Sequence, residues 1–133
     1  MSHENVELLR RFNAAFNRRD LDALLALCDP EVEVVSLRMD LEGGHPFQGH
    51  DGVRSWYGSL LDVYPDFGSE IEEVRELGEV TIARLRQYGR GRESGAPIEL
   101  TVWQVAHARN RKIVRWCVVR TEVEALEALG LPE

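Results

Sequence analysis

Apolar residues recur every three or four positions in three segments of the first half of the chain, residues 4–18, 21–27 and 52–63. Side chains at this spacing lie on one face of a helix. Asp20 and Asp51 stand at the starts of the second and third segments, where a carboxylate can accept hydrogen bonds from free backbone N–H groups. The pattern therefore predicts three helices, two of them capped by an aspartate.

A second pattern, in which apolar and polar residues alternate, predicts one early strand and four later ones. They cover residues 31–37, 67–77, 80–90, 98–108 and 113–121. A short helix over residues 122–129 is predicted to follow. Because most helices come first and a long antiparallel meander follows, we expect an α+β fold in which helices cover one face of a curved sheet. Strands of about ten residues need bends, and a bent sheet wrapped over helices leaves a cone-shaped cavity.

The composition fits one globular domain spanning residues 1–133, with 44% hydrophobic and 29% charged residues. The net charge of −7 argues against a nucleic-acid partner, because phosphate binding needs a basic surface. We expect a cytoplasmic protein without a membrane partner, since the chain has no long apolar run and its N-terminus lacks the apolar segment of a secretory signal. Cys28 and Cys117 lie far apart, and no histidine or cysteine set has metal-ligand spacing, so we expect no metal. No phosphate-binding glycine loop precedes a helix, and we expect no cofactor.

Three stretches carry a resemblance to a known family: RRFNAAFNRRDLDALLALCDPEVEVVS, FQGHDGVRSWY and KIVRW. Together they resemble the SnoaL-like, ketosteroid-isomerase-like members of the nuclear-transport-factor-2-like superfamily, over nearly the whole chain. The resemblance implies an α+β cone, a deep pocket between the first helix and the sheet, and a homodimer through the outer sheet face. It leaves the activity open, because members include isomerases, polyketide cyclases, hydratases and dehydratases.

The catalytic set of a ketosteroid isomerase is missing from the matching positions. That chemistry needs a carboxylate base and an oxyanion hole made by a tyrosine and a protonated acid. The resemblance places the tyrosine at Phe12, the base at about Val35 or Ser36, and the acid at about Trp103. We therefore expect no isomerisation of Δ5-3-ketosteroids by that mechanism.

Strand parity, aligned on the pocket-facing positions of the family, assigns two tryptophans and two arginines of the last three strands to the cavity wall. Aromatic rings suit a flat ligand, and guanidinium groups bind a carboxylate or polarise a carbonyl. We therefore predict that a small hydrophobic or amphipathic molecule with a carbonyl or carboxylate binds seven residues: Phe12, Phe16, Tyr57, Arg86, Trp103, Trp116 and Arg120. The alternative is that Arg86 or Arg120 pairs with Glu99 or Glu122 and only joins strands.

Proton transfer is assigned to the polar loop after the early strand. Asp40, His45 and His50 lie in or beside this loop, and a histidine with a pKa near ~6.5 suits general-base work at neutral pH. We predict these three as catalytic residues of a cofactor-free isomerase, cyclase or dehydratase, with the exposed polar loop as the alternative. Two other functions stay open: a non-catalytic module that binds an apolar acid in the same pocket, and a dimerisation module whose pocket is vestigial.

Overall fold

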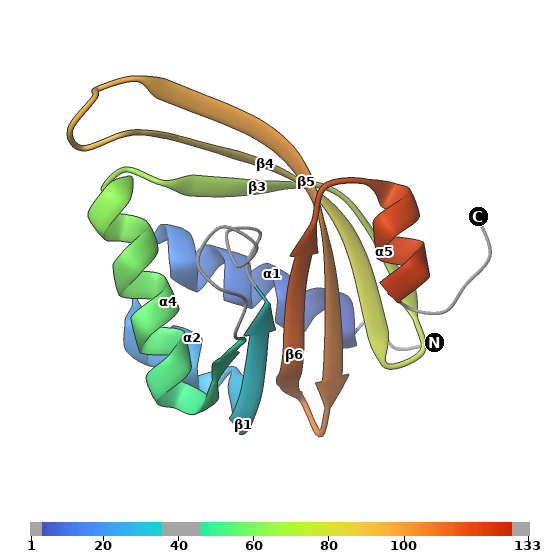
Figure 1. The fold of residues 1–133 in the computed structure, drawn as a ribbon. Coiled ribbons are helices and arrows are strands. Elements are labelled where there is room, and N and C mark those ends of the chain that lie inside the picture. Colours follow the sequence, from blue (N-terminus) through green and yellow to red (C-terminus); the bar gives the residue numbers. More distant parts are fainter. Residues whose placement is uncertain (1–3, 36–45, 129–133) are drawn as a thin grey trace.

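The structure is a computed structural model that describes residues 4–35 and 46–128. It has the predicted α+β architecture, with early helices, a mostly antiparallel sheet and a short C-terminal helix (Figure 1). The elements are, in chain order, α1 (Glu4–Asn17), α2 (Leu21–Ala26), β1 (Cys28–Val35), β2 (Phe47–Gln48), α4 (Gly49–Val63), β3 (Gly68–Leu77), β4 (Val80–Arg90), β5 (Pro97–Arg109), β6 (Lys112–Val119) and α5 (Glu122–Ala128). None of the helices in these two ranges is long and apolar enough to span a membrane.

The strands form one six-stranded sheet in the order β2-β1-β6-β5-β4-β3. β3 to β6 make the predicted antiparallel meander, and β4 and β5 pair along the whole length of β4. β1 instead pairs in parallel with β6, with Val34 opposite Trp116. Sequence pattern did not predict this pairing, which joins the first half of the chain to its last strand.

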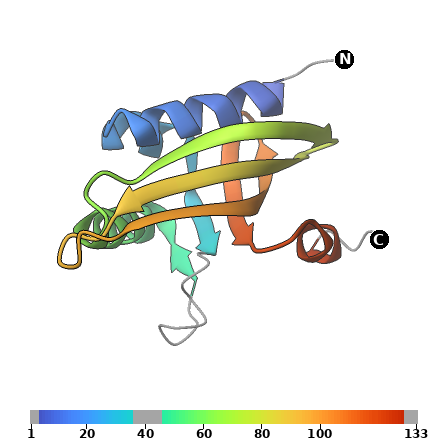
Figure 2. The same cartoon turned by 90° about the horizontal axis from the view of Figure 1, so that it is seen from above.

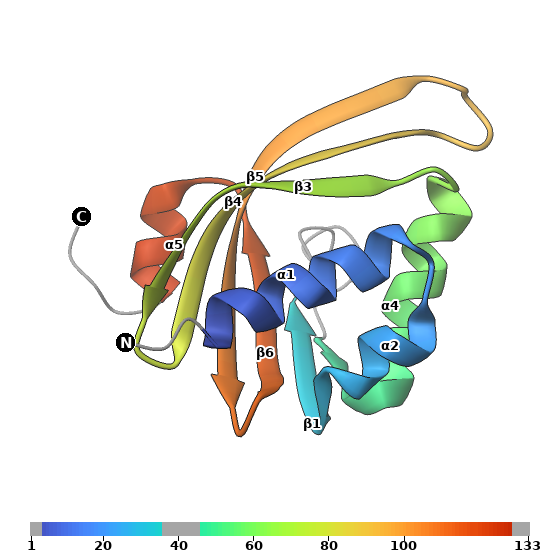
Figure 3. The ribbon, with the colours of Figure 1, turned by 180° about the vertical axis from the view of Figure 1, so that it is seen from behind.

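α1 crosses the inner face of the sheet and is attached to β3 near both of its ends (Figure 3). At its start, the Glu76 carboxylate accepts hydrogen bonds from the backbone N–H groups of Asn5 and Val6, at 3.1 and 3.2 Å. These donors have no partner within the helix, and an acidic group there also suits the helix dipole. At its end, the Asn17 side chain donates to the Ser69 carbonyl oxygen and accepts from the Ser69 N–H. The apolar face of α1 is thereby held over the sheet.

The cap predicted for the second helix is confirmed, whereas the cap predicted for the third is wrong. Asp20 accepts a hydrogen bond from the N–H of Ala23 at 3.0 Å, at the start of α2. α4 begins at Gly49, three residues before the predicted start, so Asp51 lies inside its first turn and pairs with Arg54 at 2.7 Å. The earlier start follows from β2, whose pairing with β1 brings the chain to Gly49, where a φ of +71° allows a sharp reversal.

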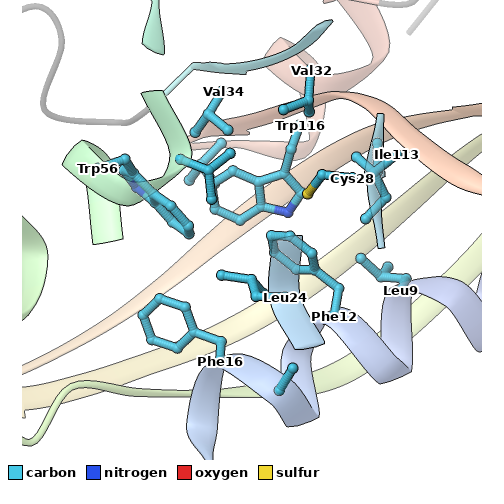
Figure 4. Packing of buried hydrophobic residues seen from close by; sticks show 14 of the residues in the cluster. Leu9, Phe12, Phe16, Leu24, Cys28, Val32, Val34, Trp56, Ile113 and Trp116 are labelled. Carbon is cyan, nitrogen blue, oxygen red and sulfur yellow. The ribbon is translucent and has the colours of Figure 1, made fainter. Parts of the chain in front are cut away.

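Two apolar clusters lie on opposite faces of the sheet. The larger one lies between the inner face and the helices α1, α2 and α4, and Figure 4 shows part of it. The smaller one lies on the outer face, where Ile82 and Val105 pack against Ala125 of α5. Seen from above, α1 and α5 lie on opposite sides of the meander (Figure 2). Both faces of β4 and β5 are therefore partly apolar, which affects how the site is assigned from sequence.

Candidate functional site

A cavity of about 140 Å³, partly open to solvent, lies between α1, α4 and the inner face of the sheet. Aromatic and aliphatic side chains make most of its wall. The aromatic ones are Phe12, Phe16, Trp56, Tyr64, Phe67 and Trp116. The aliphatic ones are Leu60, Leu85, Ile98, Leu100 and Val118. Such a wall is typical of a small-molecule site.

The aromatic rings form one packed group that joins the helices to the sheet (Figure 4). The ring centroid of Trp116 lies 5.8 Å from that of Phe12 and 5.1 Å from that of Trp56. Phe16 continues the group at 5.5 Å from Trp56. Tilted contacts at these distances are favourable for aromatic pairs. They fix the ring positions along the cavity wall.

The polar part of the wall is uncharged. Its polar side chains are Asn13, Tyr64, Ser69, Gln87 and Gln104, together with Trp116, whose indole carries an N–H. Within the ranges that the structure describes, the cavity is lined by neither a carboxylate, an imidazole nor a cationic group. Three buried polar atoms of this wall lack a hydrogen-bond partner, namely Ser69 Oγ, Gln104 Nε2 and Trp116 Nε1. A buried donor without a partner costs about 1–3 kcal/mol, so these atoms need an explanation.

The wall changes from exposed to buried along β5. Leu100 is 43% exposed, whereas Gln104, four residues further on, is 2% exposed. A strand rises roughly 3.4 Å per residue, so the two residues are roughly 14 Å apart along β5. The cavity therefore has its mouth near Leu100 and its floor near Gln104.

Three of the seven residues predicted to bind a ligand line this cavity, namely Phe12, Phe16 and Trp116. Tyr57 does not. Its ring packs edge-on against Phe16 at 5.5 Å, and the adjacent Trp56 occupies the wall.

The parity assigned to β4 and β5 is wrong. Residues directly opposite each other share a face, and Arg86 lies opposite Thr101 while Trp103 lies opposite Val119, all on the outer face. The inner face instead carries Leu85, Gln87 and Gln104. Trp103 packs in the cluster that α5 covers. The alternation of apolar residues could not reveal the error, because the outer face also carries apolar residues where α5 covers it.

Arg86 is an ion-pair residue of the outer face, so the alternative that it joins strands is confirmed. Its guanidinium lies 2.9 Å from the Glu70 carboxylate and 3.4 Å from that of Glu99, and also lies over the Tyr88 ring. The hydrogen bond to Glu70 raises the pKa of Arg86. Arg120 is exposed beyond the end of β6 and does not line the cavity. The predicted guanidinium contacts to a ligand are therefore absent from the described wall.

Of the three residues predicted to be catalytic, His50 lies in the described part of the chain, and it does not line the cavity. The ring nitrogen Nε2 of His50 lies 3.0 Å from the Cys28 carbonyl oxygen, which ties the start of α4 to β1. Asp40 and His45 lie outside the described residues, so their role stays a prediction. No group of three or more histidine, cysteine, aspartate or glutamate side chains lies close enough to hold a metal ion within residues 4–35 and 46–128.

Sequence reasoning missed the polar lining residues. Gln104 carried a visible signal, because it interrupts the otherwise apolar run VWQVA. A glutamine at the centre of a buried strand needs a hydrogen-bond partner. Ser69 carried no comparable signal. It lies near the start of a strand, next to a turn, and serine is common in turns.

The family model for the SnoaL-like domain matches residues 9–116. The chain belongs to the SnoaL-like family. This SnoaL-like chain shares its fold with solved structures of low sequence identity. An NTF2-like protein of unknown function from Burkholderia pseudomallei is 24% identical with a TM-score of 0.80, covering 96% of this chain and 97% of that one. No curated protein matches the chain.

Two further solved structures have the SnoaL-like chain's fold, one of a protein crystallised with a ligand and one of a candidate enzyme. TerC, crystallised with polyporic acid, is 22% identical with a TM-score of 0.78, covering 96% of this chain and 98% of that one. IdmH of Streptomyces antibioticus, a candidate polyketide cyclase, is 21% identical with a TM-score of 0.76, covering 97% of this chain and 100% of that one. At these identities the likeness shows the fold alone.

Proposed function

We propose that this SnoaL-like protein binds a small, largely apolar, ring-containing molecule in the cavity between α1, α4 and the sheet. The observation that carries the proposal is the wall itself, in which six aromatic side chains surround a space of about 140 Å³. A cavity of roughly 150 Å³ lined by apolar side chains is known to bind a benzene ring. The fold neighbour TerC, crystallised with polyporic acid, supports small-molecule binding by this fold.

Charge narrows the class of ligand. A carboxylate in this cavity would lose hydration without gaining an ion pair from the described wall, which is costly in a largely apolar site. An ammonium group meets the same difficulty. The proposal therefore favours a neutral molecule over the carboxylate that the sequence had left open.

The protein's own tryptophans provide the test. Trp56 and Trp116 line the cavity and Trp103 does not, so a Trp103→Phe background makes the fluorescence report on the cavity alone. 1-Indanone should quench this fluorescence through its ketone, and indane, 1-indanone and naphthalene should each raise the melting temperature. A ligand at 100 times its Kd adds about 2.7 kcal/mol to the free energy of unfolding.

A cavity-filling variant separates binding in the cavity from binding elsewhere. Val118→Phe adds a ring to the buried wall, whereas Val123→Phe adds the same ring at a residue of α5 that is exposed. Val118→Phe should abolish the quenching and Val123→Phe should preserve it, with circular dichroism used to check that both variants fold. Equal binding to both variants would mean that the cavity is not the site.

A second candidate function is cyclisation or isomerisation of a carbonyl compound, which the candidate polyketide cyclases among the fold neighbours favour. Among the described lining residues only Tyr64 is titratable, so a general base has to come from elsewhere. Asp40, His45 and His50 are the predicted sources. Changing all three to Asn or Gln should abolish turnover of a polyketide-like substrate while ring binding persists. Turnover by the triple variant would remove these residues from the mechanism.

A further inference from the structure

We propose that Gln104 and Trp116 form a donor floor in the cavity that selects a neutral carbonyl oxygen and orients the ligand with this oxygen inward. The inference rests on the proposed function, because it requires that the cavity binds a ring-containing molecule. It adds the chemical class of the recognised group and the direction in which the ligand enters.

The two residues are neighbours on the inner face of the sheet. Gln104 of β5 lies opposite Val118 of β6, and the next pair on the same face is Ala106 of β5 opposite Trp116 of β6. Diagonal neighbours of this kind have Cα atoms roughly 7–8 Å apart, within reach of one another for long side chains. A single ligand oxygen placed between them can therefore meet both donors.

Both donors are buried and unpartnered. Gln104 and Trp116 are 2% and 5% exposed, and neither Nε2 of Gln104 nor Nε1 of Trp116 has a hydrogen-bond partner. Asn17 shows that the fold does satisfy amides elsewhere, since its side chain makes two hydrogen bonds to Ser69. An acceptor bound at the floor removes the cost of two orphaned donors. Both nitrogens are buried in the ligand-free protein, so binding requires the terminal Gln104 amide to rotate and the Trp116 ring to adjust until their N–H groups meet that acceptor.

The type of ligand atom follows from the indole. A glutamine amide can donate or accept, so Gln104 alone is compatible with a ligand hydroxyl acting as donor. An indole N–H only donates, so Trp116 requires an acceptor. The described wall holds no cation to pair with a carboxylate. A neutral carbonyl, as in a ketone or a quinone, meets both conditions.

The direction of entry follows from the burial gradient. The mouth lies at Leu100, and Gln104 lies four residues deeper on the same strand and on the same face. Apolar aromatic rings line the space between. A ligand with one carbonyl end therefore enters with that end first, and its apolar body remains against the rings.

The test compares ligands of one shape. Indane has no acceptor, 1-indanone carries one neutral carbonyl, and indane-1-carboxylate carries a negative charge. The wild-type protein should bind 1-indanone about 5- to 100-fold more tightly than indane, the gain of one or two hydrogen bonds to unsatisfied donors. It should bind the carboxylate more weakly than indane.

Gln104→Met removes the amide at nearly constant volume, and Gln48→Met makes the same change at the exposed N-cap residue of α4. Gln104→Met should reduce the preference for 1-indanone about 2- to 10-fold without lowering the melting temperature of the ligand-free protein. Gln48→Met should leave the preference unchanged. The C=O stretch of bound 1-indanone, measured by infrared difference spectroscopy, should lie at lower frequency in the wild type than in Gln104→Met.

The outcomes separate the two proposals. If indane and 1-indanone bind the wild type equally, or if the preference for 1-indanone is as large in Gln104→Met as in the wild type, the donor floor is wrong while binding in the cavity stands. The same holds if the carboxylate binds best. If none of the three compounds binds, both proposals fail.

Discussion

Alanine substitution at two glycines of α4 should shift stability in opposite directions. A Cβ added at Gly52 would lie 2.8 Å from the carbonyl carbon of Phe47, closer than real Cβ contacts, whereas a Cβ at Gly58 would have no atom within 4 Å. The obstacle at Gly52 is backbone, and Phe47 is held in β2 opposite Val34. A side-chain rotation therefore cannot relieve the clash.

The magnitudes follow from two effects. Replacing glycine by alanine inside a helix stabilises it by roughly 0.5–1 kcal/mol, because alanine loses less backbone entropy on folding. Gly58→Ala should show this whole gain. Gly52→Ala makes the same gain but forces an overpacked contact that costs about 1–3 kcal/mol, so we expect a net loss of about 1–2 kcal/mol.

Urea unfolding followed by circular dichroism measures both variants on one scale. With a slope of about 1–3 kcal/mol per molar urea, the two midpoints should differ by roughly 0.5–3 M, with the wild type between them. Gly52→Ala should also weaken ring binding, because Trp56 lies one helical turn further on α4 and moves with the helix start. If Gly52→Ala is as stable as Gly58→Ala, Phe47 is not a fixed support and the account of the turn is wrong.

Three further results are expected. Arg86→Met should leave the affinity for 1-indanone within about twofold of the wild type in a fluorescence titration, because Arg86 is paired on the outer face. A larger loss of affinity would mean that Arg86 contributes to ligand binding. Burial raises the pKa of Cys28 to about 12 and also raises the pKa of Cys117. Both thiols should therefore react slowly with a thiol reagent at pH 8 in the folded protein and promptly in denaturant. Fast labelling of the folded protein would contradict their burial. Burial is the main cause that lowers the pKa of His107, and the positive charge of the nearby Arg115 lowers it further. The contribution of neutral His107 to stability is therefore present above pH 6.5 and is lost as the pH falls below that value. His107→Gln should therefore flatten the decline of the urea midpoint on the acid side of pH 6.5, and an unchanged pH profile would assign that decline to other groups.

Local pattern was enough to predict most of the fold. The four late strands were placed within two residues of their observed ends, because each alternates in polarity and is bounded by turn residues. The predicted start of α4 is three residues too late, because aspartate is a common helix cap and Asp51 therefore suggests a start at residue 52. The observed start at Gly49 depends on the pairing of β2 with β1. Pairings between distant segments, including β1 with β6, leave no mark on local periodicity.

The site was less predictable than the fold. Phe12 and Trp116 were found because they lie on the apolar face of α1 and on a strand whose parity was right. Arg86 and Trp103 were misplaced because two apolar faces cannot be distinguished by alternation. The predicted homodimer and the cytoplasmic location stay predictions.

The parallel pairing of β1 with β6 also constrains the order in which the molecule assembles. It joins Glu33 to Arg115, 82 positions apart, through a hydrogen bond as well as the strand pairing. Contacts at such separation slow folding, because a long loop must close before they form. Until β6 docks, the cavity lacks Trp116 and Val118, so a nascent chain emerging from the ribosome completes the proposed ligand site in one of the last steps.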